Sequence, residues 1–185
     1  MATAIAMAPV ASAQETTDGP LVVWNPILAA SVQRLAAESH SWRDAIAAVA
    51  ATGRRAMLVT TDDAKGWIEQ GTLAQLHPLS ESPSRIDNVL IVVNLELLQK
   101  LSGLPTKAID FEDDVDRIVA HEVYGHAVPL LLSGTVAGNC ADPAIGQSAI
   151  ASCAIQRENV IRREMRLGQR VEYGRDSLAL APWRR

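Results

Sequence analysis

The sequence predicts an α+β fold, and three observations support that class. Apolar residues recur at helical three-and-four spacing over residues 26–52. Two short runs, at 55–61 and 88–95, are rich in Val, Leu, Ile and Thr and have the composition of strands. Two further helices are expected downstream, each with polar groups inside an apolar stripe. A chain of 185 residues that is 48% hydrophobic is long enough to form one domain with its own core.

The first half of the chain is expected to contain both strands and the first helices. Residues 26–52 are expected to form two helices that divide near Ser39-His40-Ser41, with Ser41 as the N-cap of the second. After the strand at 55–61, Gly and Pro residues interrupt the chain around one short helix expected at Asp63–Gln70. The run at 88–95 is the clearest strand.

Residues 121–126 read His-Glu-Val-Tyr-Gly-His and are the most informative segment for function. In the common motif HExxH, two histidines four residues apart on one helix face bind zinc, and the glutamate serves as general base. Here one additional residue separates the histidines, so a regular helix would place His121 and His126 roughly 140° apart. A π-type turn absorbs one residue and would return both imidazoles to one side, and Gly125 would ease that distortion.

A regular helix gives a different interpretation of the same segment. It places Glu122 and His126 four residues apart, where they would form a charged pair. The segment interrupts an apolar stretch, and it holds two of the four histidines of the chain. Since a buried polar group without a partner costs roughly 1–3 kcal/mol, these side chains need a reason to be there. We therefore favour a metal site with His121 and His126 as ligands.

A third ligand is predicted in the helix expected at 147–167. Apolar residues recur there at helical spacing, and Glu158 falls on the same stripe. A carboxylate in such a stripe requires a partner. Either Glu158 binds zinc, which would leave one position open for water, or it pairs with Arg157 or Arg162.

Both segments resemble known zinc peptidases. The form HExxGH resembles the zinc helix of the dipeptidyl peptidase III family. The segment 157–162, Arg-Glu-Asn-Val-Ile-Arg, with Leu167-Gly168 and Tyr173-Gly174 after it, resembles the Glu-Asn-x-x-Arg helix of small bacterial zincin domains in effectors and polymorphic toxins. This resemblance implies Glu158 as the third zinc ligand, with Asn159 and Arg162 in supporting roles.

The implied architecture is a minimal zincin-like, or gluzincin-like, metallopeptidase domain over residues 14–185. It would contain a small sheet, an HExxxH metal helix and a C-terminal helix that bears the glutamate. By analogy with zincins, the strand at 88–95 is expected at the sheet edge beside which an extended substrate binds.

The expected cofactor is Zn2+, and the expected reaction is hydrolysis of a peptide bond in a peptide or protein substrate. Glu122 is the predicted general base, which takes the proton of the attacking water. Tyr173 is predicted to stabilise the oxyanion, because it lies in a Tyr-Gly turn just after the glutamate helix. Tyr124 is the other tyrosine, and packing within the metal helix accounts for it equally well.

Two other classes of protein remain open. The first is a catalytically inactive, zincin-derived module with a binding or structural role. A structural zinc site would need a fourth protein ligand, for which His40, His77 or a cysteine are candidates. The second is a metal-free helical interaction protein, in which Glu122 and Glu158 would pair with His126 and with arginines.

The N-terminus and the cysteines favour an exported protein. Residues 1–13 resemble the end of a signal peptide, because they are uncharged, rich in alanine and end in Ala-Ser-Ala. We therefore predict a secreted or periplasmic location. Cys140, in the loop 133–146, and Cys153, near the start of the glutamate helix, are close enough in sequence to form a disulfide. It would close a small loop in the connection between the two proposed metal-bearing helices, with free thiols or zinc thiolates as the alternatives.

Charge and hydropathy argue against two kinds of partner. The net charge is −4, and the arginines at 162, 163, 166 and 170 are expected on the exposed face of the last helix. No aromatic residues alternate with them, so nucleic acid is not an expected partner. No run reaches the ~18 apolar residues of a membrane span. The sequence does not indicate an oligomeric state.

Overall fold

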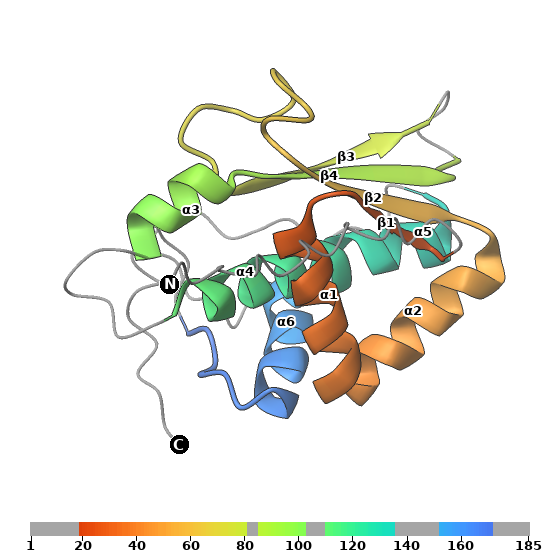
Figure 1. Cartoon of the computed structure of the whole chain (residues 1–185). Helices are drawn as coiled ribbons and strands as arrows, with labels where there is room; N and C mark the ends of the chain where they lie inside the picture. Colours follow the sequence, from red (N-terminus) through yellow and green to blue (C-terminus); the bar gives the residue numbers. More distant parts are fainter. Residues whose placement is uncertain (1–18, 81–84, 103–109, 136–151, 172–185) are drawn as a thin grey trace, which may run out of the picture.

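The fold is a mixed four-stranded sheet with helices packed on one face (Figure 1). The structure is a computed structural model that describes residues 19–80, 85–102, 110–135 and 152–171. The sheet has the order β1-β2-β4-β3, formed by Leu21–Val23, Arg55–Thr60, Asn88–Val93 and Ala74–Leu79 respectively. The first three of these strands are parallel, and β3 runs antiparallel to β4. The predicted α+β class is therefore confirmed.

The predicted pair of N-terminal helices is present as α1 (Pro26–Glu38) and α2 (His40–Thr52). The division falls at Ser39, whose hydroxyl accepts a hydrogen bond of 3.0 Å from the amide of Trp42. Ser39 is therefore the N-cap of α2, and the prediction of Ser41 for that role was wrong. Both helices contribute buried apolar residues to the core, among them Leu28, Leu35, Trp42 and Val49. Helix α1 contacts β1, whereas α2 packs against α1 and against helices later in the chain.

Two predictions for the middle of the chain were wrong. Residues 63–70 form turns rather than a helix, and they include Gly66 at a φ of 85°, a conformation that helices exclude. The strand at 88–95 is observed as β4, but it pairs on both sides and is not an edge. Within the described sheet the edge beside β4 is β3, which contains Pro78. Proline cannot donate to a ladder, so an edge position suits it.

One continuous helical rod crosses the helical layer. It consists of α4 (Phe111–Val119), a π-helical segment η1 (Ala120–Ala127) and α5 (Val128–Ser133). The side chain of Arg34 on α1 makes two bonds, of 2.8 and 2.9 Å, to the buried carboxylate of Asp116 on α4. The shorter helix α3 (Leu95–Ser102) packs against α4. None of the helices in the described ranges has the length and apolar character needed to cross a membrane.

The last described helix, α6 (Cys153–Glu164), connects the rod to α2. Its final residue, Glu164, accepts hydrogen bonds from the hydroxyls of Ser39 at 2.5 Å and Ser41 at 2.6 Å. It also accepts from the amide of Ser41 and lies 3.2 Å from His40. Glu164 thus places a carboxylate at the N-terminus of α2, where the helix dipole favours negative charge.

Replacement of Glu164 by Gln should destabilise the fold in a pH-dependent way. Partial burial raises the pKa of Glu164, but the bonds from Ser39 and Ser41 outweigh it and hold the pKa below its ordinary 4.5. The stabilisation is therefore complete above pH 4.5 and is lost as the pH falls through the lowered folded-state pKa. We expect Glu164→Gln to lower the free energy of unfolding by about 1 kcal/mol at neutral pH, measured by urea denaturation.

The difference between Glu164→Gln and the wild type should shrink as the pH falls, because the wild-type carboxyl then becomes neutral as well. Glu38→Gln, at an exposed position of α1, is the matched control and should have little effect. A loss of stability that does not change with pH would show that the charge of Glu164 is unimportant.

Candidate functional site

The two histidines of the central motif meet on the π-helical segment. Since η1 absorbs the additional residue between them, His121 and His126 lie on one side of the rod, which is the effect expected of a π-type turn. Their Nε2 atoms are 3.3 Å apart, and the rings cross at 84°. Both side chains are buried, with 7% of each residue exposed. The predicted π-type turn is confirmed.

A proline three residues after the motif helps to explain the π-helix. Pro129 has no amide proton, so it cannot donate to the carbonyl of Gly125 as a regular helix requires. The guanidinium of Arg157, on α6, donates to that carbonyl instead, at 3.2 Å. The amide of Val128 bonds to Val123, five residues earlier, which is the π-helical pattern. Pro129 is therefore a sequence signal for the π-helical turn, and the prediction did not make use of it.

Gly125 also allows the rod and α6 to approach closely. A Cβ atom added at Gly125 would lie 3.0 Å from the carbonyl oxygen of Ala154, which is tighter than normal contact. Ala154 is itself fully buried. The small residues on both helices therefore set the distance between the histidines and the residues of α6.

Glu158 on α6 reaches the histidine pair through this contact. Its Oε2 lies 2.9 Å from Nδ1 of His121, and only 1% of the residue is exposed. Burial raises the pKa of Glu158. The hydrogen bond to His121, followed by the positive charges of Arg162, His121 and Arg170, outweighs burial and lowers the pKa to about 2. Glu158 is therefore ionised, and it favours the His121 tautomer in which Nδ1 carries the proton.

Two arginines surround Glu158. Arg162 donates to its other oxygen at 2.7 Å, and Arg170 lies 3.4 Å from the oxygen that His121 also contacts. Arg162 is fully buried and Arg170 is 9% exposed, so the expectation that these two arginines lie on a solvated face was wrong. The reason is the carboxylate, which attracts cations into the interior. Arg163 and Arg166 are exposed as predicted.

Asn159 fixes the segment that carries Arg170. Its amide group donates to the carbonyl of Arg170 at 3.0 Å and accepts from the Arg170 amide at 2.7 Å. This two-way bond folds the chain after α6 back along the helix and presents the guanidinium to Glu158. Asn159 was predicted to have a supporting role, but Arg170 was not predicted as the residue that it supports.

The remaining predicted site residues are only partly described. Glu122 lies on η1 next to His121, and 9% of it is exposed. Cys153 is the first residue of α6. Tyr173 and Cys140 lie outside the described residues, so the oxyanion role and the disulfide stay predictions. His40 contacts Glu164 and His77 lies on β3, which removes both from the group around His121.

The donor atoms of the site suit zinc in part. Ligand nitrogens lie about 2.0–2.1 Å from tetrahedral zinc, which places two of them about 3.3–3.4 Å apart. The Nε2 separation of 3.3 Å matches this value, and it is also compatible with an N–H···N hydrogen bond between the two rings. However, across the described ranges no group of three or more His, Cys, Asp or Glu side chains is arranged to hold a metal ion. Glu158 meets His121 through the nitrogen remote from His126.

Comparisons with known proteins add no relatives: no protein-family model, curated protein or solved structure matches the chain.

Replacement of Gly125 by Ala tests whether close packing sets the geometry of the site. Alanine favours a helix over glycine by about 1 kcal/mol, but its Cβ would push α6 away, at a cost of about 1–3 kcal/mol. We expect a net loss of stability on urea denaturation, together with a weaker His121–Glu158 bond, seen as a shift or loss of the downfield Nδ1 proton signal. Ala48→Gly, on the exposed face of α2, measures the propensity difference alone. A more stable Gly125→Ala protein with the proton signal unchanged would contradict this role for Gly125.

Proposed function

We propose that the protein is a zinc-dependent metallopeptidase that is exported from the cell. The observation that carries the proposal is the pair of buried Nε2 atoms, 3.3 Å apart, on a π-helix that compensates the additional residue of the motif. This separation agrees with two nitrogen ligands of one zinc ion. The ionised Glu158 beside His121 supports it, because a histidine that binds metal commonly donates its other N–H to a carboxylate.

In this proposal His121 and His126 hold the ion, and Glu158 completes the site. Direct ligation by Glu158 would need another arrangement of these side chains, since Glu158 contacts the His121 nitrogen that is remote from His126. Without that rearrangement, Glu158 orients His121 through its hydrogen bond. Bound zinc would act as a Lewis acid and favour ionisation of a water molecule near neutral pH.

Glu122 is the proposed general base. It follows His121 directly on η1 and is largely buried, where a carboxylate can accept the proton of the attacking water and then pass it to the leaving amine. Tyr173 is the proposed donor to the oxyanion.

The sheet edge offers a place for an extended substrate. Within the described sheet β3 is paired only with β4, and its inner face packs against η1. A peptide that added to the outer edge of β3 would therefore run near η1, the segment that carries the histidines, with main-chain hydrogen bonds to hold it. This assigns to β3 the role that the sequence analysis gave to residues 88–95.

A metal-free interaction protein is the second candidate, and one observation favours it. Glu158 is already neutralised by Arg162 and Arg170, as that candidate requires. Zinc content separates the two proposals.

Elemental analysis of protein purified without chelator and reconstituted with zinc should give about one zinc ion per chain. His121→Ala and His126→Ala should abolish binding, because each removes one of two nitrogen ligands. His40→Ala is the matched control, since His40 is exposed and contacts Glu164, and it should retain the metal. A wild-type protein without zinc after reconstitution would rule out the metal site.

The zinc affinity of Glu158→Gln distinguishes the two roles of that residue. Loss of a carboxylate that only orients a histidine typically weakens metal binding about 10–100-fold. Loss of a direct ligand should be more severe. Competition with a calibrated chelator measures the ratio, and an unchanged affinity would exclude both roles.

Glu122→Gln should keep its zinc but lose hydrolysis of a peptide mixture, monitored by mass spectrometry, by at least 10²–10⁴-fold. Glu96→Gln, exposed on α3, is the control and should remain active. Full activity of Glu122→Gln would reject Glu122 as the general base, and zinc bound without any hydrolysis in the wild type would favour the inactive module.

A further inference from the structure

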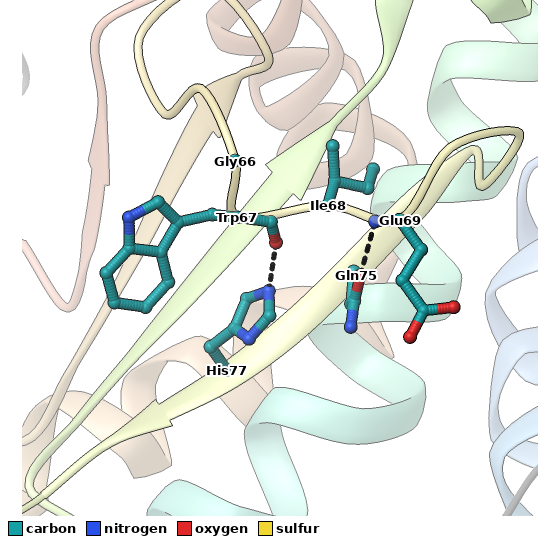
Figure 2. A pocket seen from close by; sticks show the side chains of 6 residues that line it. All are labelled: Gly66, Trp67, Ile68, Glu69, Gln75 and His77. Atoms are coloured by element: carbon teal, nitrogen blue, oxygen red, sulfur yellow. Dashed lines mark hydrogen bonds between the residues drawn. The ribbon is translucent and has the colours of Figure 1, made fainter.

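A hollow of about 190 Å³ lies between β3 and the connection that precedes it (Figure 2). Its lining consists of Gly66, Trp67, Ile68, Glu69, Gln75 and His77. The volume is below the roughly 300–1,000 Å³ of pockets that hold whole small-molecule ligands. The hollow is therefore suited to a single side chain rather than to a cofactor.

The hollow lies on the face of the sheet away from the histidines. Ala74 and Leu76 of β3 pack against the main core, so the alternating residues Gln75 and His77 point to the opposite face. The connection after β2 rises on that side, where no described helix lies (Figure 1). None of the lining residues belongs to the group around His121.

The walls of the hollow are held in place by two bonds from β3 to the backbone of the connection. Gln75 accepts from the amide of Glu69 at 3.1 Å, and Nε2 of His77 donates to the carbonyl of Trp67. The rings of Trp67 and His77 also meet edge to face, with centroids 5.4 Å apart. A site that is already formed loses little conformational entropy when a ligand binds.

The chemistry of the lining selects a cation. Glu69 supplies a carboxylate, none of the six residues is Lys or Arg, and Trp67 is 47% exposed, which leaves indole surface open to a ligand. In Figure 2 the Trp67 ring lies at one end of the hollow and the Glu69 carboxylate at the other, with His77 and Gln75 between them. A long cationic side chain can lay its apolar stem on an aromatic ring and direct its charged head to a carboxylate.

We propose that this hollow binds the side chain of an arginine in a peptide. Guanidinium fits better than ammonium at the carboxylate end, because it is planar and donates in a fork to a carboxylate, while the apolar stem lies on the indole. As a specificity subsite the hollow rests on the proposed peptidase function: a peptide on the edge of β3 would direct alternate side chains to the outer face, where the hollow lies. As a binding site it stands without that function.

Binding is tested with the His126→Ala protein, which should be unable to hydrolyse the probe. The probes are acetyl-Ala-Arg-Ala-amide and the same peptide with citrulline, which has nearly the same shape without the charge. We expect the arginine peptide to shift the indole N–H signal of Trp67 in NMR spectra, with saturation. The citrulline peptide should bind several-fold more weakly. Equal binding of the two peptides, or no shift of the Trp67 signal, would overturn the proposal.

Two variants locate the site. Glu69→Gln and Trp67→Leu, made in the same His126→Ala background, should each weaken binding of the arginine peptide by about two- to fivefold, and raised salt should reduce the effect of Glu69. Glu38→Gln makes the same change of charge on an exposed part of α1 and should leave binding unchanged. Thermal unfolding checks that each variant is folded. Unchanged affinity in both hollow variants would place any binding elsewhere.

Hydrolysis by the zinc-loaded wild type separates this proposal from the proposed function. Cleavage of arginine peptides in preference to citrulline peptides supports both. Cleavage without that preference overturns the subsite but not the peptidase. Arginine binding at Trp67 without any cleavage supports the binding site and rejects the peptidase.

Discussion

The charge of Glu158 determines how the C-terminal helix meets the rest of the protein. An ionised carboxylate in the interior costs several kcal/mol unless cations and hydrogen-bond donors surround it. Arg162, Arg170 and His121 provide them, and they come from α6, from the segment after it and from the rod. The resulting network joins three parts of the chain around one side chain. The small residues Gly125 and Ala154 bring the helices close enough for it to form.

The parts of the fold that could be predicted are those in which local sequence and tertiary packing agree. The division of the first two helices falls at Ser39, which ends α1 and caps the start of α2. β2 and β4 are short runs rich in apolar residues, a composition typical of strands that contribute to a core. The π-helix was predictable because two ligands of one metal ion would have to lie on one side of the helix. The spacing of His121 and His126 would place them apart on a regular helix.

The parts that could not be predicted depend on contacts between distant residues. β3 contains Pro78 and little apolar alternation, and it becomes a strand by pairing with β4. Arg162 and Arg170 are buried only because Glu158 is there, which composition does not reveal. The contact of Glu158 with Nδ1 of His121 depends on the orientation of one ring, and a sequence pattern carries no information about that orientation.

The hydrogen bond from Arg157 to Gly125 links the histidine geometry to a residue that is synthesised 32 positions later. Pro129 leaves the carbonyl of Gly125 without its helical donor. Until α6 docks, that carbonyl also lacks the hydrogen bond from the guanidinium of Arg157. The histidine pair should therefore acquire its final geometry late in folding, after nearly all of the described chain has left the ribosome.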